Sequence, residues 1–387
     1  MENFIFHNPT RIVFGEGVID QVGEQTRPHG GKVLLVYGRN SIKANGIYDR
    51  ITTSLVGAGL EIVEFSGVKP NPVLSHLRQG IELAKKERPD CLVAVGGGSV
   101  LDEAKAIAAG AVTDIDVWDF FTGKATIEKA LPLVTVLTVA ATGSEMNPTG
   151  VVTNEETLQK FEISAPPLYP RTSLLDPTVL YTLSSDYTAY SCVDVISHVI
   201  EAYFTAETRH TPIQDRLVEN IIVSVMESCE TCLEDPHSYQ GRATFMWAAT
   251  LALNGLPVAG VGSFSFPNHM IEHSLSAIYD IAHGAGLAIV IPGWMSYTAE
   301  KSPEKFARFG REIFGIQGNS ETQLAHEAIQ RLKSWFAKIG APVSLEEAGI
   351  PASDIPAIAE NASMLARKWG LDAYTVDEIA TVLNHCK

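Results

Sequence analysis

Three histidines lie close together in the stretch NHMIEHSLSAIYDIAHG. His269 and His273 are four residues apart, so a helix would place both imidazoles on one face. Gly284 and Gly286 follow His283 and indicate that a helix ends near that histidine. A lone histidine is most often a hydrogen-bonded core residue, whereas three histidines at this spacing favour a metal site that has at least one further ligand.

The same stretch also contains the pattern H-x-x-E-H, because Glu272 precedes His273. This is the spacing of an inverted zinc peptidase motif, in which Glu272 would be the general base. A peptidase would need one more zinc ligand elsewhere in the chain and would have no use for a nucleotide. The rest of the sequence therefore bears on which kind of site is present.

Two further candidate ligands occur upstream, in VDVISHVIEAY. They are Asp194 and His198, which are again four residues apart. Asp194 alone would be an ordinary surface carboxylate, but its pairing with a histidine on an otherwise apolar helix favours a ligand. Together with His269 and His283, these residues make a set of one carboxylate and three imidazoles. Such a set suits iron(II) or zinc and leaves a position open for a substrate.

A run of glycines follows an apolar strand pattern in CLVAVGGGSVLDEAKAIAAG. Gly96, Gly97 and Gly98 leave room for a sharp turn and for the close approach of another group. Ser99 can cap the following helix, and the alternative to a cofactor role for Asp102 is that it completes a capping box with Ser99. The free amides and the positive end of that helix would bind a pyrophosphate, even in an acidic protein.

The spacing of these glycines matches neither G-x-G-x-x-G nor a Walker loop, so the standard fingerprints do not apply. A second stretch, TVAATGSE, supplies small hydroxyl residues at another strand end, namely Thr138, Thr142 and Ser144. Such residues suit a loop around a cofactor. Taken alone, both stretches are also compatible with turns that bind nothing.

The composition limits the classes of partner. The 387 residues suggest two domains, and 45 acidic against 29 basic residues give a net charge of −16, which argues against nucleic acid and anionic membranes. The start of the sequence has no signal-peptide pattern and no apolar run could span a bilayer, so we expect a cytoplasmic protein. The five cysteines form no dense framework, and we expect Cys229 and Cys232 to be structural residues of an amphipathic helix.

Two halves of the chain differ in the secondary structure that they predict. Between residues 32 and about 180, amphipathic stretches separate the apolar runs KVLLVYG, GLEIVEFSGV, DCLVAVGGGS and LPLVTVLTVA, a pattern typical of parallel strands joined by helices. Long helical patterns follow, including AYSCVDVISHVIEAYF and TQLAHEAIQRLKSWFAKIG. We expect an α/β domain over residues 1–184 and an α-helical domain over 185–387, with the active site in a cleft between them.

Taken together, these motifs resemble the group III, iron-containing alcohol dehydrogenases. The resemblance covers nearly the whole chain, through NPTRIVFGEGVI, KPNP, GGGSVLDEAKAIA, TVAATGSE, DVISHVIEAY and the histidine stretch, and DVWDFF is most similar to the butanol dehydrogenase branch. It implies a Rossmann-like nucleotide-binding domain followed by a helical domain. It also implies a metal bound by Asp194, His198, His269 and His283, with His273 near the nicotinamide as part of a proton route.

The implied reaction is hydride transfer between a nicotinamide cofactor and small, mostly straight-chain aldehydes and alcohols, in a homodimer. The peptidase interpretation explains neither the glycine run nor the pair Asp194 and His198, and a non-catalytic nucleotide-binding module leaves the metal set without a role. Cofactor contacts are expected at the turn that follows the strand KVLLVY. They are also expected at Gly96, Gly97, Gly98, Ser99, Asp102, Thr138, Thr142 and Lys160.

The chain departs from the family pattern just before the helix that contains Asp194. Where the family usually has a proline and a glycine-rich approach, this chain has Ser184, Ser185 and the residues YSC at 190–192. The four metal ligands are intact. The start of that helix and the wall of the pocket are in question, because Tyr190 is bulky.

The turn after the strand KVLLVY bears on which dinucleotide is used. An NAD-selective site has an acid that binds the adenosine ribose and repels a 2′-phosphate. Here the chain has Gly38, Arg39, Asn40 and Ser41, which supply a positive charge and neutral donors but no acid. We therefore expect NADP(H) and aldehyde reduction as the main direction; the alternative is that Arg39 is a solvated surface charge.

Overall fold

The computed structural model describes residues 1–208 and 210–387 and forms two compact units. The sheet unit comprises His7–Leu183 and Pro236–Asn254, and the helical unit comprises Met1–Phe6, Ser184–Asp235 and Gly255–Lys387. The chain thus leaves the sheet unit after Leu183 and returns to it for one segment, which contains helix α9 (Tyr239–Ala252).

A six-stranded parallel sheet lies at the centre of the sheet unit, with the strand order β1-β8-β5-β4-β2-β3. The four apolar runs predicted as parallel strands are found in this sheet, which confirms the α/β assignment. The inner strands β2, β4 and β5 are almost wholly buried, as expected for strands covered on both faces. The strands are β1 (Arg11–Phe14), β2 (Lys32–Tyr37), β3 (Glu61–Ser66), β4 (Cys91–Gly97), β5 (Leu133–Val139) and β8 (Thr172–Leu175).

The register of the inner strands brings their carboxyl ends to one edge of the sheet. Tyr37 of β2 pairs with Val95 of β4, and Gly97 of β4 pairs with Val139 of β5 after a register shift. In parallel α/β sheets, ligands bind at this edge. The turn after β2, the glycine run after β4 and the loop after β5 are therefore neighbours, as a shared cofactor site requires.

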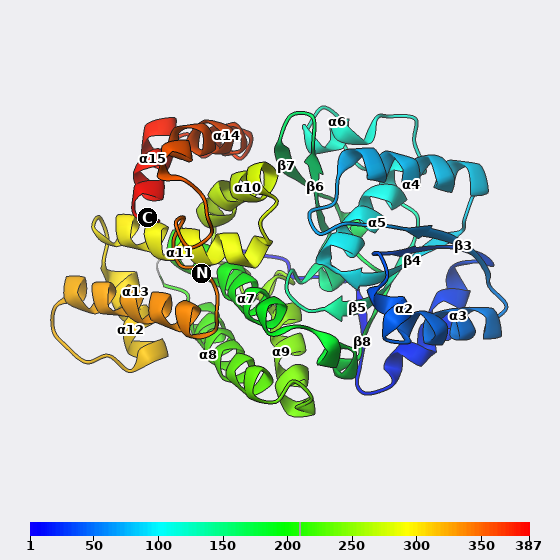
Figure 1. Cartoon of the computed structure of the whole chain (residues 1–387), viewed down its shortest axis with the longest axis horizontal. Coiled ribbons are helices and arrows are strands. Elements are labelled where there is room, and N and C mark those ends of the chain that lie inside the picture. Colours follow the sequence, from blue (N-terminus) through cyan, green and yellow to red (C-terminus); the bar gives the residue numbers. More distant parts are fainter. Residues whose placement is uncertain (209) are drawn as a thin grey trace. The chain divides into compact units, whose positions relative to one another are not determined.

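Helices cover the strands of this unit, and α4 and α5 lie above them in Figure 1 while α2 and α3 lie below. Helix α4 packs against α5, and α5 also packs against β6, which forms a short antiparallel hairpin with β7. The elements are α1 (Val22–Thr26), α2 (Ser41–Ala44), α3 (Ile47–Gly57), α4 (Leu74–Glu87), α5 (Gly98–Gly110), α6 (Val117–Phe121), β6 (Thr149–Asn154) and β7 (Gln159–Ser164). Short 3-10 segments include η3 (Ser144–Met146), which lies between β5 and β6.

The helical unit consists of helices among its described residues, as predicted for the second half of the sequence. Helix α11 is apolar on nearly every side, so it lies in the core and packs against α7, α10, α13 and α15. None of the described helices has the length and apolarity to cross a membrane. The helices are α7 (Ser185–Thr205), α8 (Pro212–Glu234), α10 (Pro267–Tyr279), α11 (His283–Ala299), α12 (Glu304–Phe314), α13 (Glu321–Lys338), α14 (Ile355–Lys368) and α15 (Val376–Asn384).

Candidate functional site

Three helices of the helical unit present the residues that the sequence predicted as metal ligands. Helix α7 contains Asp194 and His198 one turn apart, α10 contains His269, and His283 is the first residue of α11. The serine that replaces the family pattern before α7 caps this helix, because the Ser184 hydroxyl accepts a hydrogen bond from the Tyr187 amide at 3.3 Å. The start of α7 is therefore regular in spite of the departure from the family pattern.

The four side chains converge within the helical unit. Asp194 Oδ1 lies 3.6 Å from His198 Nε2 and 3.6 Å from His283 Nε2. The His198 and His269 rings stack with their centroids 4.9 Å apart, and ligand atoms of Asp194, His198 and His269 all lie within 4.8 Å of one another. The structure thus brings together one carboxylate and three imidazoles that are separated by up to 89 positions in the sequence.

Two ring nitrogens of this cluster, His198 Nδ1 and His269 Nε2, are buried without a hydrogen-bond partner. His269 Nε2 is buried and has no hydrogen-bond partner, while the opposite ring nitrogen, Nδ1, is bonded to Glu201. A buried polar atom without a partner is costly, and a cation would satisfy it. Burial, together with the nearby His269 and His283 rings, holds the pKa of His198 well below its usual value, which favours the neutral imidazole that a metal binds. The donor set and its electrostatics therefore fit a divalent ion.

Two fully buried glutamates are bonded to the Nδ1 atoms of His269 and His283. Glu201 Oε1 lies 3.0 Å from His269 Nδ1 and also accepts a hydrogen bond from the His269 backbone amide at 3.0 Å. Glu272 Oε2 is bonded to His283 Nδ1, and its other oxygen accepts from the Ser276 hydroxyl at 2.5 Å. A carboxylate bonded to the far nitrogen of a ligand histidine fixes its tautomer and ring orientation. Glu201 was not predicted from the sequence.

The glycines after His283 do not end a helix, which corrects that expectation. Helix α10 ends at Tyr279, after which Asp280 adopts a left-handed backbone with φ of 52°, and α11 begins at His283. A Cβ atom on Gly284 would lie 2.0 Å from the Tyr190 carbonyl oxygen, and one on Gly286 would lie 2.6 Å from Glu272 Oε1. These glycines therefore allow close packing of α11 against α7 and α10, a tertiary constraint that the local rule for helix ends does not contain.

His273 lies beside the four-residue cluster. It is 5% exposed, and its ring centroid is 5.7 Å from that of His283 and 6.3 Å from that of His269. Ligand atoms of Glu272, His273 and His283 also lie within 4.8 Å of one another, which would allow a second grouping around a metal. We favour the first grouping, because both oxygens of Glu272 are already bonded, to His283 and to Ser276.

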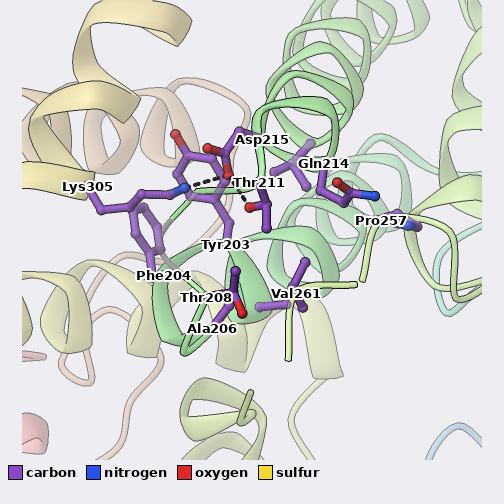
Figure 2. A pocket seen from close by; sticks show the side chains of 12 residues that line it. Tyr203, Phe204, Ala206, Thr208, Thr211, Gln214, Asp215, Pro257, Val261 and Lys305 are labelled. Atoms are coloured by element: carbon purple, nitrogen blue, oxygen red, sulfur yellow. Dashed lines mark hydrogen bonds and ion pairs between the residues drawn. The ribbon is translucent and has the colours of Figure 1, made fainter. Parts of the chain in front are cut away.

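A separate hollow of the helical unit begins one residue beyond Glu201 in the sequence and is shown in Figure 2. Its charged side chains are paired, with Lys305 Nζ 2.5 Å from Asp215 Oδ1, and the Thr211 hydroxyl donates to the same oxygen at 3.2 Å. Lys305 also lies over the Tyr203 ring, 4.1 Å from its centroid. These groups satisfy one another, and we assign no chemistry to this hollow.

In the sheet unit, most of the predicted cofactor residues gather at the carboxyl ends of the parallel strands. Gly96 and Gly97 end β4, and Gly98 opens α5. A Cβ atom on Gly98 would lie 2.4 Å from the Thr142 side chain, so the glycine run and the loop after β5 are in direct contact. Gly38 and Gly96 both face Val100 of α5, which joins the turn after β2 to the same group.

The predicted capping role of Ser99 and Asp102 is wrong. Helix α5 begins at Gly98, its N-cap is Gly97, and no side chain caps it, so Ser99 lies inside the first turn. Asp102 Oδ1 instead accepts from the Ser144 hydroxyl at 2.6 Å, and Oδ2 accepts from the Val151 amide at 3.1 Å. The acid is bonded to residues distant in sequence, because the helix buries it against the segment after β5.

The remaining predicted cofactor residues occupy different surroundings. Arg39, Asn40 and Ser41 are exposed at the start of α2, and Thr138 is half-buried in β5. Lys160 of β7 is buried, and its Nζ donates to the Asn71 side chain at 3.0 Å.

Comparison with known proteins gives consistent similarities over the whole chain. Residues 9–177 match the model of the iron-containing alcohol dehydrogenases, and residues 188–385 match the C-terminal model of the same family. The chain is 43% identical to a probable NADH-dependent butanol dehydrogenase 2 of Bacillus subtilis (strain 168), over 94% of this chain and 93% of the other. It is 37% identical to the NADPH-dependent aldehyde reductase YqhD of Escherichia coli (strain K12), over 92% of each.

A solved structure is also similar. The NADH-dependent butanol dehydrogenase A of Thermotoga maritima superimposes with a TM-score of 0.96 at 47% identity, over 100% of this chain and 99% of the other.

Proposed function

This chain belongs to the iron-containing alcohol dehydrogenase family, and we propose that it reduces small, mostly straight-chain aldehydes with NADPH. As a member of this family it is a metal-dependent oxidoreductase acting on CH–OH groups, of the butanol dehydrogenase type. The peptidase interpretation of Glu272 is therefore discarded. The homodimer that the resemblance implies stays a prediction, which sedimentation of the purified protein tests.

Asp194, His198, His269 and His283 are the proposed metal ligands. The observation that supports this most strongly is the buried, unpartnered His269 Nε2, in a ring that Glu201 holds from the opposite side. When bound, the metal supplies a Lewis acid that polarises the carbonyl group of the substrate. Iron is the metal for which the family is named, and the same nitrogen and oxygen donors also suit zinc.

The turns of the sheet unit are the proposed dinucleotide site. When bound, the dihydronicotinamide supplies the hydride, and the chain supplies binding and orientation. The amides of Gly97, Gly98 and Ser99 at the start of α5 would hold the pyrophosphate, with Thr142 beside them. The other predicted contacts at this edge are Gly38, Asn40, Ser41, Gly96, Asp102 and Thr138, and Lys160 on β7 is a further predicted contact.

The choice between the two dinucleotides rests on residues of this chain, because the similar proteins include both NADH-dependent and NADPH-dependent enzymes. The turn Gly38–Ser41 contains no acid, and Arg39 is exposed there. An exposed guanidinium at this position can pair with a 2′-phosphate, which NADP(H) has and NAD(H) lacks. We therefore keep NADP(H) as the proposed cofactor.

His273 is the proposed proton-relay residue. Its ring is buried beside His283, while the four ligands already supply the protein's share of the metal sphere. A His273→Ala variant is expected to keep its metal and to change the pH profile of kcat. Loss of metal as complete as in His269→Ala would show that His273 is a ligand, and an unchanged profile would exclude the relay.

The proposed function is tested by measuring kcat/KM for NADPH and for NADH with butanal, in the parent and in Arg39→Asp. We expect the parent to prefer NADPH by about tenfold or more, the effect of one charge-assisted hydrogen bond, and the variant to shift toward NADH. A parent that prefers NADH, or a variant whose preference does not move, would contradict the cofactor assignment. Failure to reduce butanal with either dinucleotide would contradict the substrate class.

A further inference from the structure

Lys105 is a fully buried lysine in α5, two turns beyond the glycine run. Most of the other residues of this helix are apolar or glycine. Its ammonium group donates to the Ser144 hydroxyl at 2.7 Å, to the Thr149 carbonyl at 2.7 Å and to Asn147 Oδ1 at 3.3 Å. A lysine ammonium has three N–H donors, and three acceptors surround it here. Ser144 and Asn147 belong to the segment that links β5 to β6, and Thr149 is the first residue of β6.

These bonds continue to the proposed dinucleotide site. The Ser144 hydroxyl donates a hydrogen bond to Asp102 Oδ1 at 2.6 Å. The Ser144 amide donates to the Thr142 hydroxyl at 3.2 Å. Thr142 in turn packs against Gly98, where α5 begins. The segment therefore contacts α5 at three points: Ser144 is bonded to Lys105 and to Asp102, and Thr142 packs against Gly98 at the first residue of the helix.

The far side of the segment is also fixed. Glu145 Oε1 accepts a hydrogen bond from the Thr250 hydroxyl of α9 at 2.5 Å, and the Glu145 carbonyl accepts from Ser173 of β8 at 2.6 Å. Ser144, Glu145 and Asn147 of the segment are buried, which strengthens their hydrogen bonds, whereas Thr142 and Thr149 are half-buried. Bonds to Lys105, Asp102 and Thr250 thus hold the residues that directly follow Thr142.

We propose that Lys105 is a positioning residue for the dinucleotide: through Ser144 it holds Thr142 against Gly98 and so sets the shape of the turn that binds the pyrophosphate. Lys105 itself is fully buried in α5 and would act on the cofactor through these residues. The inference rests on the proposed function, since it assigns a role within the same dinucleotide site.

The charges around Lys105 make this positioning sensitive to pH. Burial lowers the pKa of Lys105 to about 8, while the carboxylates of Asp102 on α5 and Glu145 in η3 partly offset that effect. Lys160 on β7 acts on Asp102 in the same neighbourhood. Loss of the proton removes one of the three donors, so the segment is held less firmly above pH 8.

The experiment is a fluorescence titration of NADPH and of NADH into the metal-loaded enzyme, for the parent, Lys105→Met and Ser144→Ala. We expect Lys105→Met to raise the dissociation constant by about tenfold or more and Ser144→Ala to raise it by about threefold, from the loss of charged and of neutral hydrogen bonds. The metal content of both variants should match that of the parent. Between pH 7 and pH 9 the parent should lose affinity, and Lys105→Met should not.

Lys85→Met is the matched control, because Lys85 lies on α4 in the same unit and its contact to Asp114 at 3.6 Å is at the surface. It should bind both dinucleotides as the parent does. A dissociation constant for Lys105→Met within about twofold of the parent would overturn the proposal, on the scale where one hydrogen bond changes affinity several-fold. If Lys105→Met does not fold, parent-like binding by Ser144→Ala would overturn it instead. A parent that binds neither dinucleotide would contradict the proposed function itself.

Discussion

The two units of this protein build their candidate sites in different ways. In the helical unit the site consists of side chains, four ligands from three helices with Glu201 and Glu272 behind them. In the sheet unit it consists largely of backbone, at turns where glycines allow close approach and small hydroxyl residues complete the surface. A side-chain site depends on the chemical identity of each residue, whereas a backbone site depends on shape. Substitutions at the site in the helical unit should therefore weaken metal binding, and substitutions at the site in the sheet unit should weaken dinucleotide binding.

The largest effect among the supporting residues is expected from Glu201→Gln. The change removes the negative charge that orients His269 and should weaken metal binding about 10- to 100-fold, while dinucleotide binding stays as in the parent. Competition with a chelator, followed by elemental analysis, measures the metal affinity. Glu227→Gln, an exposed residue of α8, is the control and should retain the parent affinity. Equal metal affinity in Glu201→Gln and the parent would show that this carboxylate does not orient a ligand.

A pair of glycine substitutions should separate the two sites. Gly98→Ala adds a methyl group that displaces Thr142, and Gly286→Ala adds one that displaces Glu272. We expect Gly98→Ala to weaken dinucleotide binding about tenfold with the metal retained, and Gly286→Ala to weaken metal binding about tenfold with the dinucleotide retained, in line with the cost of overpacking.

Gly57→Ala on α3 is the control for this pair, because no atom lies within 4 Å of the added methyl group. Dinucleotide titration and metal analysis on all three variants measure both affinities. If either substitution in the pair impaired both sites equally, the proposed independence of the two sites would be wrong.

The smallest effect concerns a histidine–carboxylate pair in the sheet unit, where His76 Nδ1 lies 2.6 Å from Glu103 Oε1. The hydrogen bond to Glu103 raises the pKa of His76 above 6.5, so its stabilising effect is complete below pH 6.5 and is lost as the pH rises through the higher folded value. His76→Gln should therefore destabilise the protein more at pH 6 than at pH 8.5, by on the order of 1 kcal/mol. Urea unfolding at both pH values measures this, and a larger loss at pH 8.5 would contradict the sign.

The sequence predicted the parts of the fold that depend on local pattern. The apolar runs that became β2 to β5 and the periodic stretches that became α7, α8 and α13 were recognisable because burial imposes a period on the chain. The strands β1 and β8 have only four residues each, too few to show such a period. The hairpin of β6 and β7 was also missed, since its strands are largely polar and have no long apolar run.

The same distinction applies to the residues of the candidate site: those with a local sequence pattern were predicted, and those without one were missed. Asp194 with His198 and His269 with His273 were recognisable because helical spacing places each pair on one face. Glu201 reads in the sequence as one more acid on a helix, and Lys105 as one more base, because their partners lie 39 to 68 positions away. Their one local signal is a charge within an apolar helix. The helix that begins at His283 was missed because the packing of Gly284 and Gly286 against neighbouring helices outweighs their tendency to end one.

The most direct test of this account is elemental analysis of the protein after anaerobic purification, for the parent and for a double variant, Asp194→Ala with His283→Ala. The account predicts about one equivalent of iron or zinc per chain in the parent, as one set of four protein ligands allows. The double variant should lose the metal and still bind the dinucleotide. Full metal occupancy in the double variant would contradict the assignment of the metal to Asp194, His198, His269 and His283.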